Sequence, residues 1–249
     1  MIQASGVSEG ELLVLAPLES EVSDLLQALG RAGRGEPVAV AAPARVLSFA
    51  HPGGAVVVGW TGMGSAATQR ALSALLARRP RALLHMGVAG ALRRELAPGD
   101  AVLVSAVHRG QERRACELEP GLAARLAAAG ARQGACVTVE RPAGAPADKA
   151  ALAARHPDAL VVEMETWWAH EAARQAGVAF VGLRVVVDGL DQPLPDLGGA
   201  LDEAGNPRPL KLAATLLRRP GAVRHLPAVG RAFAKARERL TALGLAALG

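Results

Sequence analysis

Short apolar runs recur along the chain, and most of them are followed by a segment with helical spacing. The run at 178–187 is apolar and β-branched almost throughout, which is typical of a strand buried on both faces of a sheet. Such runs predict strands at 11–16, 45–49, 55–60, 82–85, 134–139, 159–162 and 178–187.

Helices are predicted where apolar residues recur every three or four positions. Gly30 and Gly177 follow two of these segments and are usual residues at helix ends. Ser65 is expected to cap the helix that follows the glycine-rich turn at 61–65. The predicted helices span 18–29, 66–78, 121–129, 166–175, 210–217 and 222–245. Strands alternating with helices favour an α/β fold.

Acidic residues follow three of these predicted strands. Two strands joined by one helix are normally parallel neighbours, so we expect Glu165 and Asp188 to meet at one edge of the sheet. Glu19 and Glu21 follow the first strand, at the start of a helix. Both would suit the positive end of that helix, but we favour a functional role for Glu21. Ligands of open α/β sheets bind at the carboxyl ends of the strands, so the sequence predicts a site there.

Composition narrows the class of protein. The chain has 249 residues, a formal net charge of +5 and only 2% aromatic residues, so stacking surfaces for nucleic acid are not expected. One α/β domain with an added helical segment accounts for the length. Cys116 and Cys136 lack metal or redox spacing. No run of about 18 apolar residues and no secretory pattern occurs, so we expect a cytoplasmic protein.

The segments 162–165 (VEME) and 183–188 (LRVVVD) resemble the paired signature of the nucleoside phosphorylase and nucleosidase superfamily, which includes the methylthioadenosine/adenosylhomocysteine nucleosidases. The glycine-rich turn at 61–65 and the small-residue loop at 86–92 resemble other parts of this family. The resemblance implies three layers, with a central mixed, mostly parallel sheet flanked by helices. It also implies cleavage of the bond between a sugar and a purine base, no cofactor and no metal, and a homo-oligomer.

The chemistry of that cleavage suggests a role for each acidic residue. Burial at a strand end would raise the pKa of Asp188, which is the candidate acid that protonates the leaving base. Glu165 is the candidate anchor of the ribose diol, and Glu21 would orient or deprotonate an attacking water. The other predicted substrate contacts are Met164 against the sugar, Glu163, Gly87, Val88 and Arg184. For Arg184 a structural ion pair is an equal alternative.

Two departures from the family pattern leave questions open. Family members often have a hydroxyl residue where this chain has Val88, so a phosphate contact there is in doubt and phosphate stays only an alternative co-substrate to water. Pro142 occupies the place of the aromatic residue that stacks on the base in this family. Trp167 and Trp168 are the aromatic residues that could contact the base instead.

The C-terminal part differs from that of the methylthioadenosine nucleosidases. We expect a catalytic domain at 11–200 and a helical extension of it at 201–249, whose motifs resemble the hopanoid-associated branch and imply adenosylhopane as substrate. A basic side of the last helix would then contact the inner membrane surface peripherally, although an ordinary closing helix is the simpler alternative. The basic residues concerned are Arg224, Arg231, Lys235, Arg237 and Arg239.

Three other interpretations stay open at this point. The acidic and basic residues could form a buried ionic network that serves the fold alone. The protein could be a nucleoside-binding protein without activity. It could also be a small-molecule enzyme that acts on methylthioadenosine, adenosylhomocysteine or another purine nucleoside.

Overall fold

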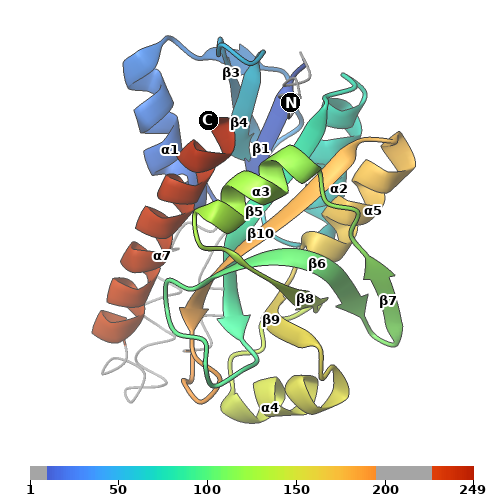
Figure 1. The fold of residues 1–249 in the computed structure, drawn as a ribbon, viewed down its shortest axis with the longest axis vertical. Helices are drawn as coiled ribbons and strands as arrows, with labels where there is room; N and C mark the ends of the chain where they lie inside the picture. The colour runs from blue at the N-terminus through green and yellow to red at the C-terminus, as the bar shows by residue number, and fades with distance from the viewer. Residues whose placement is uncertain (1–9, 195–225) are drawn as a thin grey trace, which may run out of the picture.

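The computed structural model describes residues 10–194 and 226–249. One mixed sheet runs through the molecule, and helices cover both of its faces (Figure 1), which confirms the predicted α/β class. The predicted link at 201–209 and helix at 210–217 lie outside the described residues, as does Arg224. None of the helices in the described part is both long and apolar enough to cross a membrane.

Seven of the strands follow the predicted apolar runs, several of them longer than expected, while β2, β6 and β7 lie outside those runs. They are β1 (Leu12–Ala16), β2 (Glu36–Val38), β3 (Arg45–Phe49), β4 (Val56–Trp60), β5 (Ala82–Ala91), β6 (Ala101–Arg109), β7 (Glu112–Ala115), β8 (Arg132–Thr138), β9 (Ala159–Glu163) and β10 (Ala179–Asp188).

The helices include one that the sequence analysis did not predict, at 146–155. They are α1 (Glu19–Ala32), α2 (Gly64–Leu76), α3 (Pro120–Ala128), α4 (Pro146–Arg155), α5 (Thr166–Ala176) and α7 (Leu226–Leu248). The expected cap at Ser65 is wrong, because α2 begins two residues earlier than predicted and Met63 is its N-cap. Gly177 ends α5 in the left-handed conformation, as a glycine after a helix commonly does.

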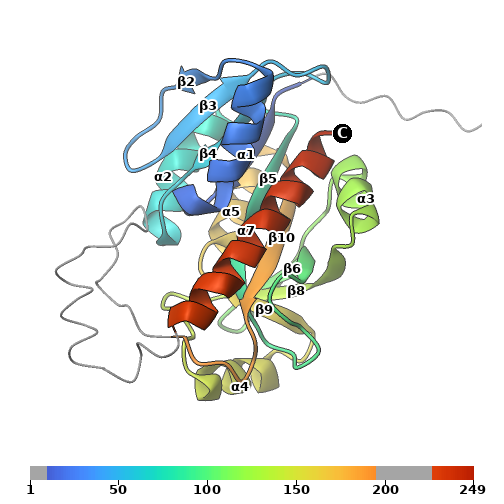
Figure 2. The same ribbon diagram turned by 90° about the vertical axis from the view of Figure 1, so that its left-hand side faces the viewer.

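Two apolar cores lie on opposite faces of the sheet. Alternate residues of β1 point to opposite sides: Leu12 and Val14 belong to one core, and Leu13 and Leu15 to the other. The first core also contains residues of α1, α3 and α7, and the second contains residues of α2 and α5. Figure 2 shows α7 lying alongside α1 on the same face. These packed layers fix where the strand ends lie.

The glycine- and alanine-rich segment at 86–91 is strand rather than loop, which corrects the prediction. β5 continues through Gly87 and Gly90 because this stretch pairs in parallel with β10, Gly87 opposite Arg184 and Gly90 opposite Asp188. Glycine lowers strand propensity, so the sequence pattern predicted a loop.

β9 and β10 are not parallel neighbours, so that prediction is also wrong. β5 lies between them: it pairs in parallel with β10 along its length and antiparallel with β9 at Gly90 and Ala91. Within the described part, β10, β6, β8, β9 and β5 pair in turn and close into a ring. Closure of this ring brings the carboxyl ends of β9 and β10 to one cavity.

Candidate active site

The ends of β1, β5, β9 and β10 surround a cavity of about 160 Å³. Its charged side chains are all acidic: Glu21, Glu163, Glu165 and Asp188 line it together with Met164. The remaining wall is small and apolar, formed by Pro17, Leu18, Met63, Val88, Ala89, Gly90, Val139, Pro142, Ala143, Val162, Val187 and Leu194. Both predicted catalytic residues thus line the cavity, together with four of the six predicted substrate contacts: Glu163, Met164, Glu165 and Val88.

Glu21 is held at the start of α1 by backbone amides. Its Oε2 accepts a hydrogen bond from the Leu18 N–H at 2.8 Å, and its Oε1 accepts one from the Val88 N–H at 2.8 Å. Burial raises the pKa of Glu21 to about 7, although the two amide bonds and Arg184 oppose this rise. Each carboxylate oxygen still has a lone pair to offer, so Glu21 can take a proton from a water near neutral pH.

Gly87 and Val88 contact Glu21 rather than open space. A Cβ at Gly87 would lie 3.1 Å from Glu21 Oε1, so only glycine allows the carboxylate to come this close to β5. The Val88 side chain lines the cavity, but its N–H is already bound to Glu21. The predicted backbone contact from Val88 to a ligand therefore has no free donor.

Glu163 is bound on both oxygens by the protein. Its Oε2 accepts from Arg184 Nη2 at 3.0 Å and from the N–H groups of Glu165 at 2.9 Å and Thr166 at 2.7 Å. Its Oε1 accepts from the Thr138 hydroxyl at 2.5 Å, and that hydroxyl accepts from the Trp167 N–H. Glu163 therefore fixes the turn between β9 and α5, where Glu165 begins the helix.

The structure does not bring Arg184 to the cavity wall. A guanidinium has five N–H donors, and here Nε and Nη2 donate to Glu163, Nη1 donates to the carbonyls of His85 and Leu183, and Nη2 also contacts His85 Nδ1 at 2.8 Å. Because arginine only donates, Nδ1 of His85 accepts and Nε2 bears the proton. Burial, together with Arg184, holds the pKa of His85 well below its usual value, so this imidazole is neutral.

Glu165 links the start of α5 to the start of α2. Its Oε1 accepts a hydrogen bond from the Gly64 N–H at 2.8 Å. Burial raises the pKa of Glu165 to about 8, with the negative charge of Glu163 as the next cause. The remaining lone pairs of this carboxyl group lie on the cavity, beside the Met164 side chain, where a diol could donate to them.

Asp188 is paired with a lysine that the sequence analysis missed. Lys149, on α4, donates from Nζ to Asp188 Oδ2 and to the carbonyls of Gly189 at 2.8 Å and Gln192 at 2.9 Å. Oδ1 of Asp188 is buried and has no hydrogen-bond partner in the described part of the chain. Burial raises the pKa of Asp188 and Lys149 lowers it, with burial the larger effect. Oδ1 is therefore the oxygen available to a ligand.

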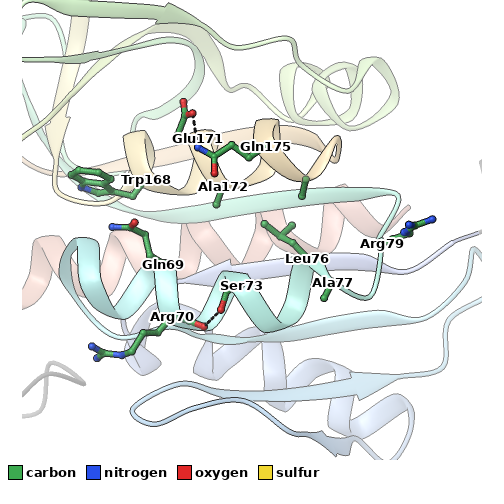
Figure 3. A pocket seen from close by; sticks show the side chains of 11 residues that line it. Gln69, Arg70, Ser73, Leu76, Ala77, Arg79, Trp168, Glu171, Ala172 and Gln175 are labelled. Atoms are coloured by element: carbon green, nitrogen blue, oxygen red, sulfur yellow. Dashed lines mark hydrogen bonds between the residues drawn. The ribbon is translucent and has the colours of Figure 1, made fainter.

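The two tryptophans lie away from the cavity. Trp167 is buried in the core below α5, with the Arg114 guanidinium 4.9 Å from its ring centre. Trp168 borders a separate surface hollow of about 960 Å³ between α2 and α5 (Figure 3). Arg109 stacks on the Trp168 ring at 4.3 Å. The cavity wall beside Pro142 is apolar instead, so Val139, Ala143 and Leu194 would contact a base there.

The described part of the chain contains no candidate metal site. Residues 10–194 and 226–249 contain no group of three or more His, Cys, Asp or Glu side chains that could hold a metal ion. Burial raises the pKa of Cys136 well above its usual value, and Cys116 is also buried. Neither thiol is therefore a nucleophile or ligand at neutral pH.

Solved structures share this fold at low sequence identity. A 5′-methylthioadenosine/S-adenosylhomocysteine nucleosidase from Colwellia psychrerythraea 34H, in complex with adenine, is 18% identical with a TM-score of 0.74; the alignment covers 97% of this chain and 96% of that one. The corresponding nucleosidase from Neisseria meningitidis, in complex with methylthio-immucillin-A, is 17% identical with a TM-score of 0.68, covering 94% and 98%. Futalosine hydrolase of Helicobacter pylori is 15% identical with a TM-score of 0.65, covering 89% and 97%.

No curated protein matches the sequence. Residues 11–218, most of the chain, match the Phosphorylase superfamily. This match agrees with the resemblance of the two sequence signatures and with the shared fold. The chain belongs to the Phosphorylase superfamily.

Proposed function

We propose that this protein is a hydrolase that cleaves the bond between ribose and adenine in an adenine nucleoside. One observation supports this most strongly: four carboxyl groups converge on one apolar cavity, and no basic side chain is among its described lining residues. Two of these carboxyl groups, Glu21 and Glu165, have pKa values of about 7 and about 8, so they can exchange protons at neutral pH.

Each carboxyl group has a role in this reaction. Cleavage leaves positive charge on the sugar and negative charge on the base. Asp188 would protonate the departing base through Oδ1, which has no protein partner in the described part. Glu165 would accept hydrogen bonds from the ribose diol, with Met164 against the sugar. Glu21 would take the proton of the attacking water.

Water suits this cavity better than phosphate does. A phosphate dianion would face the carboxyl groups without a lysine, an arginine or a hydroxyl side chain among the described lining residues. The nearby guanidinium of Arg184 already donates to Glu163 and to His85. The N–H of Val88 is likewise bound to Glu21. These contacts favour hydrolysis over phosphorolysis.

A second hollow next to the cavity supports a substrate with a group on the 5′ side of the sugar. A volume of about 160 Å³ is small for a whole nucleoside, since ligand pockets usually measure about 300–1,000 Å³. A second hollow of about 220 Å³ shares Met63, Val139 and Met164 with the cavity. Ribose bound at Glu165 would therefore extend its 5′ substituent across the two methionines into this hollow.

The C-terminal motifs suggest a more specific substrate, adenosylhopane. Leu194, the last described residue before 195–225, borders the cavity. The basic side of α7 gives the membrane hypothesis less support. Arg237 pairs with Asp24 at 2.7 Å, and Arg239 donates to the Ala129 carbonyl at 2.5 Å, so both are engaged within the fold. Flotation with anionic liposomes tests membrane contact, and light scattering tests the expected homo-oligomer.

Release of free adenine tests the proposed function. Purified protein is incubated with methylthioadenosine, adenosylhomocysteine and an adenosyl lipid, and adenine is measured by chromatography. The proposal predicts adenine from at least one of these with catalytic turnover. A thermal shift with no release of adenine from any of them would indicate a binding protein without activity and would contradict the proposal.

A further inference from the structure

Lys149 is the one side chain of α4 that is completely buried, and it lies behind Asp188. Its Nζ has three acceptors: Asp188 Oδ2, the Gly189 carbonyl and the Gln192 carbonyl. A neutral amine has only two N–H groups and could not donate to all three. The three acceptors therefore require the charged ammonium form.

A buried ammonium is costly unless it is paired and hydrogen-bonded. An apolar side chain of similar length could fill the space, and such replacements of buried ion pairs are often neutral or stabilising. Leu152 and Ala153 of the same helix are half-buried and pack against the apolar cluster that contains Val137 and Val162, so α4 has apolar contacts with the core besides Lys149. The charge of Lys149 therefore acts mainly on Asp188, to which its ammonium group donates a hydrogen bond.

The pairing leaves the two oxygens of Asp188 in different states. Lys149 occupies Oδ2, which fixes the carboxyl group, while Oδ1 has no partner in the described residues. Asp188 also lines the cavity, opposite Gly90, where a Cβ would come within 3.2 Å of Oδ2. One oxygen is thus held by a cation and the other is available to the leaving base.

Three other carboxyl groups, those of Glu21, Glu163 and Glu165, line the same cavity as Asp188, and the remaining charged groups near it are paired elsewhere or exposed. On β10, Arg184 binds Glu163 of β9 and His85 of β5. In the following loop, Asp191 pairs with Arg94 at the surface. The remaining charged residues of α4 are Asp148 and Arg155, both exposed. Lys149 is accordingly the charge that acts most directly on Asp188.

We propose that Lys149 is a positioning residue for Asp188: it holds Oδ2, directs Oδ1 to the base, and stabilises the carboxylate that forms when the proton leaves. This inference rests on the proposed function. As the C–N bond breaks, its electron pair goes to the base, and a ring nitrogen takes the proton from Oδ1. Water forms the new C–O bond and gives its proton to Glu21. Lys149 keeps all its protons; Glu21 then releases its proton to solvent, and a proton from solvent restores Asp188.

Lys149→Met tests this role, with Lys235→Met as a control that removes the same charge from an exposed site on α7. Two readouts are needed: the pKa of Asp188 in the free protein, from NMR of its carboxyl carbon, and the pH profile of kcat/KM. Loss of the ammonium should raise the pKa of Asp188 by about 1–3 units. The alkaline limb of the profile should shift upward with it, and kcat should fall by about tenfold because the acid is weaker. Lys235→Met should change neither readout.

The two readouts separate failure of this inference from failure of the proposed function. An unchanged pKa of Asp188 and an unchanged alkaline limb in Lys149→Met would overturn the role of Lys149, even if the enzyme releases adenine. Absence of adenine release from the wild type would overturn the function, while the NMR titration would still test Lys149. If Lys149→Met does not fold, Lys149→Gln replaces it, since it keeps an N–H donor without the charge. Failure of both to fold would show that Lys149 serves folding and would overturn the proposal.

Discussion

Two buried ion pairs adjoin the same cavity, and they differ in how completely they are satisfied. In the pair of Glu163 with Arg184, both carboxylate oxygens and every N–H of the guanidinium have protein partners. In the pair of Asp188 with Lys149, the ammonium is fully bonded but Oδ1 of the carboxyl group has no partner in the described part.

The difference separates a structural task from a chemical one. Buried polar groups normally find hydrogen-bond partners, so a group without one needs a reason. Glu163 and Arg184 hold β9, β10 and the start of α5 in place, which positions Glu165. Asp188 has an unused oxygen on a cavity sized for part of a nucleoside. A substitution in the pair of Glu163 with Arg184 should therefore mainly lower stability, whereas a substitution in the pair of Asp188 with Lys149 should mainly lower turnover.

Arg184→Met should have the largest effect, and it should be on stability. It leaves Glu163 buried without its cation, which typically costs about 3–5 kcal/mol in the free energy of unfolding. Chemical denaturation measures this change. Arg174→Met is the matched control, because Arg174 pairs with Glu171 at the surface and its loss should barely change stability. Similar stability in both variants would contradict the structural role of Arg184.

Asp188→Asn should abolish most turnover while the protein stays folded. Loss of a general acid typically lowers the rate by about 10²–10⁴-fold, whereas affinity for an unreactive analogue should stay within about tenfold. Steady-state kinetics and calorimetry measure the two quantities. Asp191→Asn, in the loop that follows β10, is the control, since Asp191 pairs with Arg94 at the surface. Activity of Asp188→Asn within a few-fold of the wild type would remove Asp188 from the acid role.

Glu165→Gln should reduce the preference for ribosyl over 2′-deoxyribosyl substrates. The variant keeps an oxygen for the Gly64 N–H but has an NH2 group in place of the second carboxyl oxygen, which the diol would contact. The ratio of kcat/KM for the two sugars measures this preference. An unchanged ratio would show that Glu165 does not contact the diol.

The same variant should also change how stability depends on pH. Burial and Glu163 raise the pKa of Glu165 from 4.5 to about 8, so the folded protein keeps a proton that the unfolded chain releases. The wild type should therefore lose stability as the pH rises from 4.5 through about 8, and the uncharged glutamine should lessen that loss. Denaturation at several pH values checks the sign. The prediction would be contradicted if Glu165→Gln lost stability with rising pH as steeply as the wild type does.

Trp168→Ala should have the smallest effect on turnover. Trp168 borders the hollow between α2 and α5 rather than the carboxylate cavity (Figure 3). The variant loses the stacking of Arg109, which is worth about 0.5–1 kcal/mol at an exposed site. Values of kcat/KM should stay within about threefold of the wild type. A loss comparable to that of Asp188→Asn would indicate that this ring contacts the base.

The sequence predicted the elements with strong apolar patterns and the acids at their ends. β10 is a continuous apolar strand that ends at Asp188, and Pro17 ends β1 just before Glu21. These local patterns are independent of what surrounds them. The neighbours of each strand are not local, so the position of β5 between β9 and β10 was missed.

α4 and its lysine were missed for another reason. Pro146 in the first turn, Asp148 beside it and Arg155 in the last turn are usual helix signals, so the helix itself could have been found. The burial of Lys149 could not have been predicted from the sequence. Lysine is almost never fully buried, and Asp148 is the only acidic residue near it in the sequence. Its partner, Asp188, lies 39 positions away.

Identification of the sugar product tests the central claim most directly. The protein is incubated with its adenine nucleoside in ¹⁸O-labelled water, with and without phosphate, and the products are identified by mass spectrometry. The arrangement of carboxyl groups around the cavity predicts free adenine and a sugar with one ¹⁸O at the anomeric carbon, at rates that phosphate does not change. A sugar 1-phosphate formed only when phosphate is present would contradict hydrolysis at this site.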